Sequence, residues 1–124
     1  MSTQELTRSN FDDIVSNNDL VILDFWASWC GPCKSFAPVY EDAAKKYPDI
    51  VFGKIDTESE QGLAQAFQIR SIPTLMIFKE QIVVFSQPGA LPASALDELI
   101  KNAKELDMDK IRADIEQRKS GPSA

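Results

Sequence analysis

The order of the periodic segments predicts an α/β fold: a three-layer α/β/α sandwich in which helices flank a central mixed β-sheet. Helix-like and strand-like segments alternate through the first half of the chain, and two strand-like segments only two residues apart follow them. A long amphipathic segment comes last. With 124 residues, 44% of them hydrophobic, the chain has the size and composition of one globular domain with its own core.

The first half of the chain supplies two helices and two strands. Apolar residues at three- and four-residue spacing predict a short helix that begins at residue 11 and ends near residues 17 and 18. Residues 20–26 are apolar at nearly every position, which is typical of a strand buried on both faces at the centre of a sheet. A second helix is predicted over residues 34–47, and a second strand over residues 50–55.

The second half begins with a short helix predicted over residues 61–67. Residues 74–79 and 82–87 have the composition of strands, and only Glu80 and Gln81 separate them, which predicts an antiparallel hairpin. The last long helix is predicted to start near Pro92. Its buried stripe consists of Leu96, Leu99, Ile100, Ala103 and Leu106.

Residues 107–124 are predicted to form a C-terminal helical extension with a frayed tail over residues 120–124. Met108, Ile111 and Ile115 keep helical spacing there, but they are rotated from the preceding stripe. The chain therefore divides into a domain over residues 1–106 and an extension over residues 107–124. The extension is either a marginal helix or a helix that docks a partner or a second copy through these three residues.

The composition argues against several classes of partner. A net charge of −6 leaves no basic surface that would neutralise the phosphates of a nucleic acid. No apolar run approaches the ~18 residues of a membrane span. Residues 1–5 lack the basic and apolar segments of a secretory signal, so we expect a cytoplasmic, reducing location. There, a close pair of cysteines is more often catalytic or metal-binding than structural.

Both cysteines of the chain, Cys30 and Cys33, lie in a Trp-Cys-Gly-Pro-Cys motif directly after the predicted central strand. Cys30 therefore stands where a strand gives way to a helix, and the free N–H groups and dipole of the helix start favour its thiolate. This effect, about 1–2 kcal/mol, lowers the thiol pKa from its ordinary value toward neutral pH. Pro32 fits a first helical turn, where no N–H is needed. Cys33, one turn further, is expected to be more shielded, so the pair divides into an attacking and a resolving thiol.

Two other uses of the cysteine pair have less support. A structural zinc ion requires four ligands, and the chain has no histidine and no third cysteine, so two chains would have to share the metal. A purely structural disulfide would close a loop of two residues and restrain little of the unfolded chain. Redox exchange is therefore the preferred interpretation.

Residues outside the cysteine pair leave alternatives open. Asp24 interrupts the apolar central strand: if buried, it has a raised pKa and can exchange protons with the thiols, and otherwise it simply reaches solvent. Lys54, on the neighbouring strand, is either its partner, lowering that pKa, or a solvated lysine. Trp29 is either part of the core or an exposed lid. Ile72-Pro73-Thr74, at a strand start, is by itself an ordinary turn signal.

Taken together, these residues resemble the thioredoxin family over about residues 4–105. The matching motifs, in the family's order and spacing, are Asp24-Phe25-Trp26-Ala27, Trp29-Cys30-Gly31-Pro32-Cys33-Lys34, Pro38, Lys54, Ile72-Pro73-Thr74 and Gly89. The resemblance implies a thioredoxin fold in a thioredoxin domain over residues 1–106. It also implies a protein-disulfide reductase that maintains cytoplasmic redox homeostasis by dithiol–disulfide exchange.

The resemblance implies a role for each candidate site residue. Cys30 attacks a substrate disulfide, and Cys33 resolves the mixed disulfide. Asp24 relays the proton of Cys33, aided by Lys54. The Ile72–Pro73 peptide bond is cis and places the backbone of Ile72 beside the cysteines, where it hydrogen-bonds an extended substrate chain. The implied apolar docking face consists of Trp29, Gly31, Pro32, Ile72, Pro73, Gly89 and Ala90.

The implied partners are disulfide-containing protein substrates and a thioredoxin reductase that passes electrons from NADPH through its flavin. The protein itself is expected to bind no cofactor and no metal, and to be a monomer. Two alternatives stand beside this reading: a disulfide oxidant or isomerase, and a thioredoxin-fold binding subunit that acts independently of redox state. Ser28 and Ser35 occupy positions where the family often has larger or charged residues, and the extension has no counterpart in the family's short form.

Overall fold

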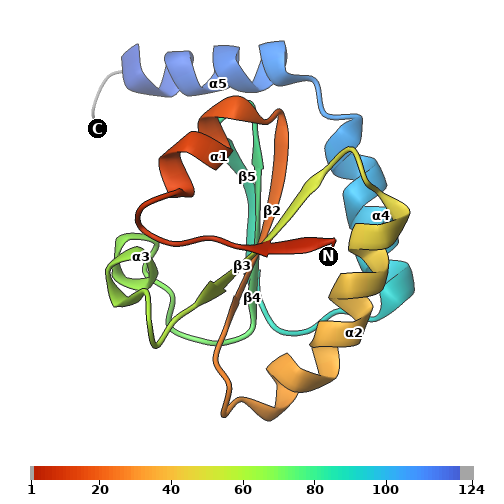
Figure 1. The fold of residues 1–124 in the computed structure, drawn as a ribbon. Coiled ribbons are helices and arrows are strands. Elements are labelled where there is room, and N and C mark those ends of the chain that lie inside the picture. Colours follow the sequence, from red (N-terminus) through yellow and green to blue (C-terminus); the bar gives the residue numbers. More distant parts are fainter. Residues whose placement is uncertain (1, 121–124) are drawn as a thin grey trace.

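A mixed five-stranded sheet forms the middle layer of the fold (Figure 1), with the strand order β1-β3-β2-β4-β5. The computed structural model describes residues 2–120, so the predicted tail lies outside the described residues from residue 121 onward. The sheet consists of β1 (Thr3–Glu5), β2 (Leu20–Trp26), β3 (Val51–Asp56), β4 (Thr74–Lys79) and β5 (Ile82–Pro88). β1, β3 and β2 pair in parallel, whereas β4 pairs antiparallel with both β2 and β5. The predicted mixed sheet is confirmed, and only β1 was missed, because its three residues show no apolar period.

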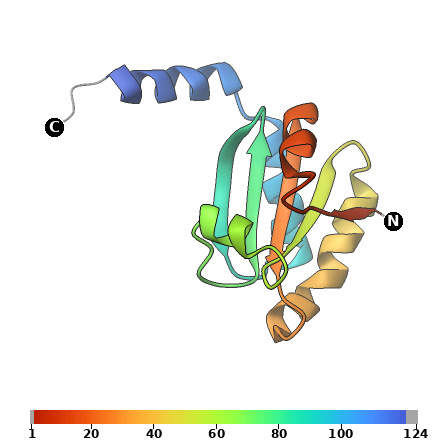
Figure 2. The ribbon, with the colours of Figure 1, turned by 60° about the vertical axis from the view of Figure 1, so that its left-hand side comes forward.

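Helices cover both faces of this sheet, as the sequence predicted (Figures 1 and 2). One hydrophobic cluster joins residues of β2 such as Leu20 and Ile22 to α2 and α4, and another joins Val21, Leu23 and Phe25 to α1 and the α3 region. Successive side chains of β2 thus point to opposite faces. The helices of the described residues are α1 (Phe11–Asn17), α2 (Gly31–Lys46), α3 (Gln61–Ala66), α4 (Ala93–Lys104) and α5 (Met108–Ser120).

A buried lysine fixes the end of α4. The ammonium of Lys79, at the end of β4, donates hydrogen bonds to the carbonyl oxygens of Ala103 (2.8 Å), Lys104 (2.9 Å) and Leu106 (3.2 Å). A helix end leaves its last carbonyls without intrahelical partners, and this cation satisfies them. The helix therefore stops at Lys104, and the prediction that Leu106 belongs to its buried stripe is wrong, since Leu106 is 37% exposed.

The hairpin and the C-terminal helix meet at the opposite end of the sheet from the start of α2 (Figure 1). Glu80 and Gln81 have φ of 51° and 69°, the left-handed values of a tight two-residue hairpin turn, although neither is Asn or Gly. Helix α5 is separate from α4, and the carboxylate of Asp107 accepts a hydrogen bond from the N–H of Lys110 at its start (3.2 Å). None of the helices in residues 2–120 has the length and apolar character needed to cross a membrane.

Candidate active site

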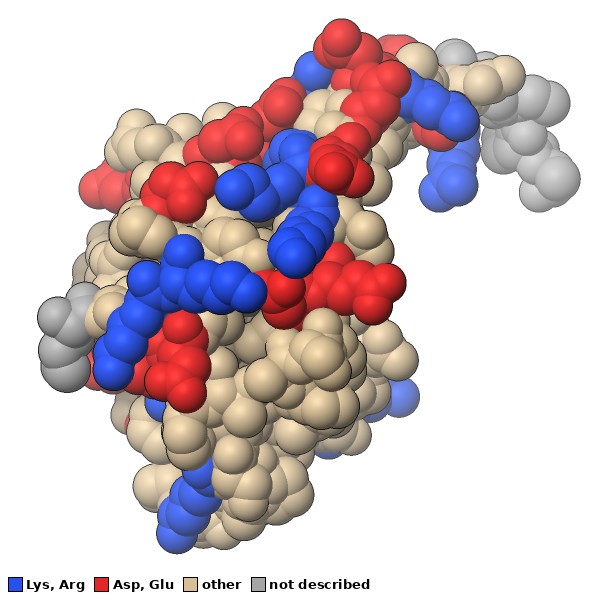
Figure 3. Space-filling model, turned by 90° about the vertical axis from the view of Figure 1, so that its right-hand side faces the viewer, with Lys and Arg blue, Asp and Glu red and all other residues tan. Residues whose placement is uncertain are grey.

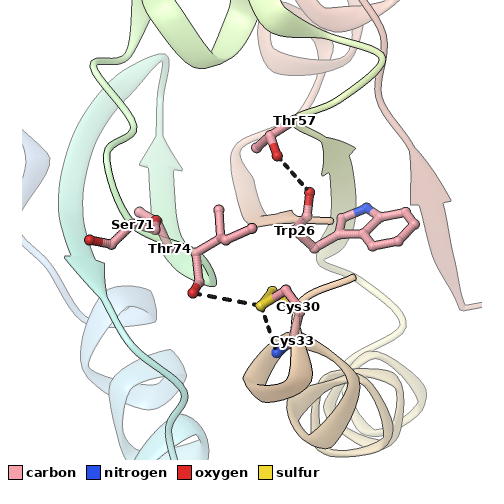
Figure 4. Close-up of a disulfide and its surroundings, with 7 residues drawn as sticks. Trp26, Cys30, Cys33, Thr57, Ser71 and Thr74 are labelled. Carbon is pink, nitrogen blue, oxygen red and sulfur yellow. Dashed lines mark hydrogen bonds between the residues drawn. A yellow bond between two sulfur atoms is a disulfide. The ribbon is translucent and has the colours of Figure 1, made fainter. Parts of the chain in front are cut away.

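The two cysteines form a disulfide at the start of α2 (Figure 4). Cys30 is the N-cap residue of the helix, and its Sγ accepts a hydrogen bond from the N–H of Cys33 (3.2 Å). The helix begins at Gly31 rather than at residue 34 as predicted, because Pro32 can occupy a first turn that needs no N–H. Cys30 therefore occupies the strand-to-helix corner at which a backbone N–H favours a thiolate.

Exposure does not distinguish the two sulfurs in this disulfide form. Cys33 was expected to be more shielded than Cys30, but each residue is 4% exposed, so that expectation is wrong here. Cys30 is covered because Ile72 packs against the cysteines and its carbonyl oxygen lies 3.7 Å from Cys30 Sγ. What sets Cys30 apart is its position as the helix cap.

Two loops complete the rim around the disulfide. The Ile72–Pro73 peptide bond is cis, as the resemblance implied. The N–H of Gly89 donates to the carbonyl of Pro73 (2.8 Å), which ties the loop after β5 to the start of β4. Gly89 has φ of +106°, a conformation that side chains disfavour, so this position requires glycine.

The predicted docking residues differ in exposure. Trp29 is 66% exposed and therefore not part of the core. On the face covered by α2 and α4, charged residues gather toward the end away from the start of α2, and the end near that start is mostly uncharged (Figure 3). An exposed aromatic side chain with few charges around it suits the docking of an apolar chain. Of the other docking residues, Ile72 is half-buried, Pro73 is buried, and Gly31, Pro32, Gly89 and Ala90 are exposed.

Asp24 lies on the face of β2 that meets α2, because it follows Ile22 at a spacing of two. It is 1% exposed, and within the described residues neither carboxylate oxygen has a hydrogen-bond partner. Burial therefore raises the pKa of this carboxyl from 3.8 to about 7, against a smaller opposing effect of Lys54. The buried alternative for Asp24 is the one that the structure shows.

Lys54 and Trp26 lie beside this carboxylate. Lys54 pairs with Asp24 in the register of β3 and β2, yet no ion pair joins the two among the salt bridges of residues 2–120. Its ammonium lies instead 4.9 Å from the ring centroid of Trp26, at cation–π distance. The indole N–H of Trp26 is buried and has no partner within the described residues. Lys54 thus acts on Asp24 through charge alone.

Two supporting residues were missed at the level of sequence. Thr57 receives no prediction, but its hydroxyl and its N–H both donate to the carbonyl of Trp26 (3.0 and 2.9 Å; Figure 4). The hydroxyl of Tyr40 lies within hydrogen-bond distance of the carbonyls of Ile22 (2.9 Å) and Gly53 (2.7 Å). Burial, together with the charge of Asp24, raises the pKa of Tyr40. Only the position of a tyrosine on the apolar side of α2 could have indicated such a contact.

The chemistry open to this arrangement is a two-electron exchange between its own sulfurs and another disulfide. Among residues 2–120, no group of three or more His, Cys, Asp or Glu is placed to hold a metal ion. A disulfide at the start of α2, a cis-proline loop packed against it and a buried carboxyl on the sheet face that α2 covers together define a thiol–disulfide oxidoreductase. The Thioredoxin family model matches residues 2–102. The chain belongs to the thioredoxin family, whose members need no bound cofactor, and it is a dithiol–disulfide reductase.

Relatives and solved structures agree with this assignment. "Putative thioredoxin 2" of Streptomyces coelicolor is 58% identical over 119 residues, which cover 96% of this chain and 89% of the relative. "Thioredoxin-1" of Saccharomyces cerevisiae is 39% identical and covers 83% of this chain over its whole length. A Plasmodium falciparum thioredoxin structure shares 40% identity with a TM-score of 0.75, covering 81% of this chain and 98% of its own. A mutant thioredoxin of Halobacterium salinarum shares 36% identity with a TM-score of 0.78, covering 86% and 95%.

The C-terminal helix lies within the match to one relative and beyond the end of the family model. An alignment of 119 residues in a chain of 124 must begin by residue 6 and reach at least residue 119, so the Streptomyces match includes α5. The family model, in contrast, ends at residue 102, before the end of α4. The helix is therefore an addition to the domain that defines the family.

Proposed function

We propose that Cys30 attacks the disulfides of protein substrates and that Cys33 resolves the mixed disulfide. The observation that carries this assignment is that Cys30 caps α2 and its Sγ accepts the N–H of Cys33. That N–H stabilises a thiolate on Cys30, and a thiolate is the form that attacks a disulfide. Cys33, inside the first turn, faces Cys30 at bonding distance but has no comparable donor among the hydrogen bonds of the site.

Each turnover transfers two electrons to the substrate. The Cys30 thiolate attacks one substrate sulfur, so a bond between Cys30 and that sulfur forms while the substrate disulfide breaks, and the other substrate sulfur leaves as a thiolate. Cys33 then loses its proton and attacks Cys30 Sγ. The mixed disulfide breaks, the second substrate thiolate leaves, and the Cys30–Cys33 disulfide seen here is the product. Protons taken up by the two thiolates complete the reduced substrate.

Asp24 is proposed as the proton acceptor for Cys33. With a pKa of about 7, its carboxyl exchanges protons at neutral pH, and it lies on the face of the sheet that α2 covers. Lys54 holds this pKa below the value that burial alone would give. We expect Asp24→Asn to slow resolution by Cys33 more than attack by Cys30, as followed by stopped-flow fluorescence. Equal slowing of both steps would contradict the relay.

Substrate docking is proposed at the rim formed by Trp29, the Gly31-Pro32 pair, the cis-proline loop and the Gly89-Ala90 loop. The exposed Trp29 and the nearby Ile72 carbonyl support this, since one offers apolar area and the other a backbone acceptor. We further propose that the oxidised protein is re-reduced in the cytoplasm by a flavin-containing thioredoxin reductase using NADPH. The proposed units are residues 1–106, which carry this chemistry, and residues 107–124.

The deciding experiment couples NADPH oxidation to reduction of a protein disulfide in the presence of a thioredoxin reductase. Steady NADPH consumption is expected with the wild-type chain and none with Cys30→Ser. Cys33→Ser should accumulate a covalent mixed disulfide with the substrate, visible on a non-reducing gel, whereas Cys30→Ser should not. A mixed disulfide that forms on Cys33 instead would reverse the assignment of the two thiols. A chain with both cysteines changed to serine that retains its cellular effect would favour the redox-independent binding subunit.

A further inference from the structure

An apolar groove lies between α5 and β5, far from the disulfide. Its volume is about 300 Å³, roughly ten times the share of one water molecule in the liquid. Val83 and Leu106 in its walls are 44% and 37% exposed. The groove is lined by Ile82, Val83, Val84, Leu106, Ile111, Asp114, Ile115 and Arg118.

The first half of the helix that forms one wall is anchored to the rest of the chain. Met108 is buried, and Arg112 forms ion pairs with Asp109 and with Glu80 of the hairpin turn. Beyond this anchor, α5 (blue in Figure 2) projects past β5 (teal) and away from the sheet. Ile111 and Ile115 remain half-buried on the projecting helix. The geometry is that of a fixed arm whose apolar side is only partly covered.

The strand that forms the other wall carries no charged residue. β5 is an outer strand of the sheet, and its seven residues contain no charge. Edge strands usually carry charged residues or are covered, because an exposed edge pairs readily with another chain. Pro88 lies at the other end of β5 from the groove, whereas the bulge between β4 and β5 falls at Val84, which lines the groove. The uncharged edge strand β5 therefore lies next to α5, a helix whose apolar side is only partly covered.

Opposite charges stand one helical turn apart at the groove. Asp114 and Arg118 both line it, and neither belongs to an ion pair within the described residues. If a second α5 lay antiparallel across the first with Ile115 near the two-fold axis, Asp114 of each chain would oppose Arg118 of the other. A two-fold contact makes each such pair twice. The groove is thus complementary in charge to its own helix.

We propose that this groove is a homodimer interface, in which α5 of a second copy lies antiparallel against α5 and places its Ile115 between the helix and β5. The charge distribution favours this face over others. α5 carries four basic and three acidic residues, a net charge of +1, so the rest of the chain carries −7. Two copies repel each other wherever their acidic surfaces meet and repel least through α5. The dimer replaces the monomer expected from sequence and leaves both disulfides free.

Sedimentation equilibrium of the full chain tests the proposal directly. The weight-average mass is expected to rise with concentration, from 13.8 kDa toward twice that value, as the chain passes through the micromolar range. Ile115→Asp should remain at the mass of one chain. Circular dichroism and the rate of protein-disulfide reduction should not change in this variant, because α5 lies at the end of the sheet opposite the start of α2 (Figure 1).

Charge reversal tests the antiparallel pairing. Asp114→Arg and Arg118→Asp should each raise the dissociation constant about tenfold, since each puts like charges together twice. The double variant should return to near the wild-type value. Lys110→Asp, which makes the same charge change as Arg118→Asp but lies outside the groove, serves as the matched control for that variant. Three results would each overturn the proposal. The wild-type chain could stay at the mass of one chain, or the dimer could persist in Ile115→Asp. The double variant could also have a dissociation constant no lower than those of the two single variants.

Discussion

Replacing Asp24 by asparagine removes a buried carboxyl that has no hydrogen-bond partner among the described residues. The amide has nearly the same shape but cannot ionise, so the substitution isolates the free energy of placing a negative charge at this position. In the wild-type chain that free energy depends on pH, because the carboxyl is neutral at low pH and charged at high pH.

The size of the effect follows from the pKa of Asp24. The carboxyl binds its proton with a pKa of about 7 in the folded chain and 3.8 in the unfolded chain. Because the folded pKa is raised, the stability contributed by the neutral form is complete below pH 3.8 and is lost as the pH rises to about 7. At 1.36 kcal/mol per pKa unit, the full loss is about 4 kcal/mol. The free energy of unfolding of Asp24→Asn should therefore exceed that of the wild type by up to this amount above pH 7, and the two should match near pH 4.

Urea unfolding of the oxidised protein at about pH 4 and about pH 9 measures this difference. Other acidic groups also titrate over this range, so the informative quantity is the gap between variant and wild type at each pH. Asp42→Asn, which removes an exposed carboxylate from α2, is the control. Its free energy of unfolding should differ from that of the wild type by nearly the same small amount at both pH values. A gap for Asp24→Asn that does not widen with pH would refute the assignment of a raised pKa to this residue.

Three further substitutions test contacts that support the fold, each by urea unfolding at neutral pH. Tyr40→Phe removes the hydroxyl shared by the carbonyls of β2 and β3 and should cost about 1–2 kcal/mol; no loss would mean that the hydroxyl is not buried there. Lys79→Met leaves the last carbonyls of α4 without a donor and should cost about 2–4 kcal/mol, against a negligible change for the exposed Lys101→Met. Gly53→Ala places a Cβ 2.5 Å from Leu6 Cδ1 and should cost about 1–3 kcal/mol; a neutral result would show that the leucine moves freely.

The layers of the fold were predictable because the signals are local. The run of apolar residues in β2 and the spacing of two residues between β4 and β5 are written in the sequence itself. What could not be predicted depends on contacts between distant segments. β1 exists only because it pairs with β3, and α4 ends at Lys104 because an ammonium from β4 lies beneath its last carbonyls.

The candidate site divides in the same way. The cysteine pair and its helix could be inferred from the motif alone, since the strand before it and the proline within it fix the local geometry. Asp24 was ambiguous because burial on one face of a strand depends on what covers that face. Thr57 and the ring contact of Lys54 gave no signal, because both involve Trp26, which lies about 30 residues away in the chain.

The hydrogen bonds of Lys79 also set a lower limit on the length of a functional fragment. Its third acceptor is the carbonyl of Leu106, which lies beyond the residues matched by the family model. A fragment that ended at residue 102 would leave a buried ammonium with none of its three acceptors. One that ended at residue 106 would keep all of them and lose only α5. Engineers who graft this domain onto another protein should therefore join it after Leu106, where the helical arm can be exchanged without exposing a buried charge.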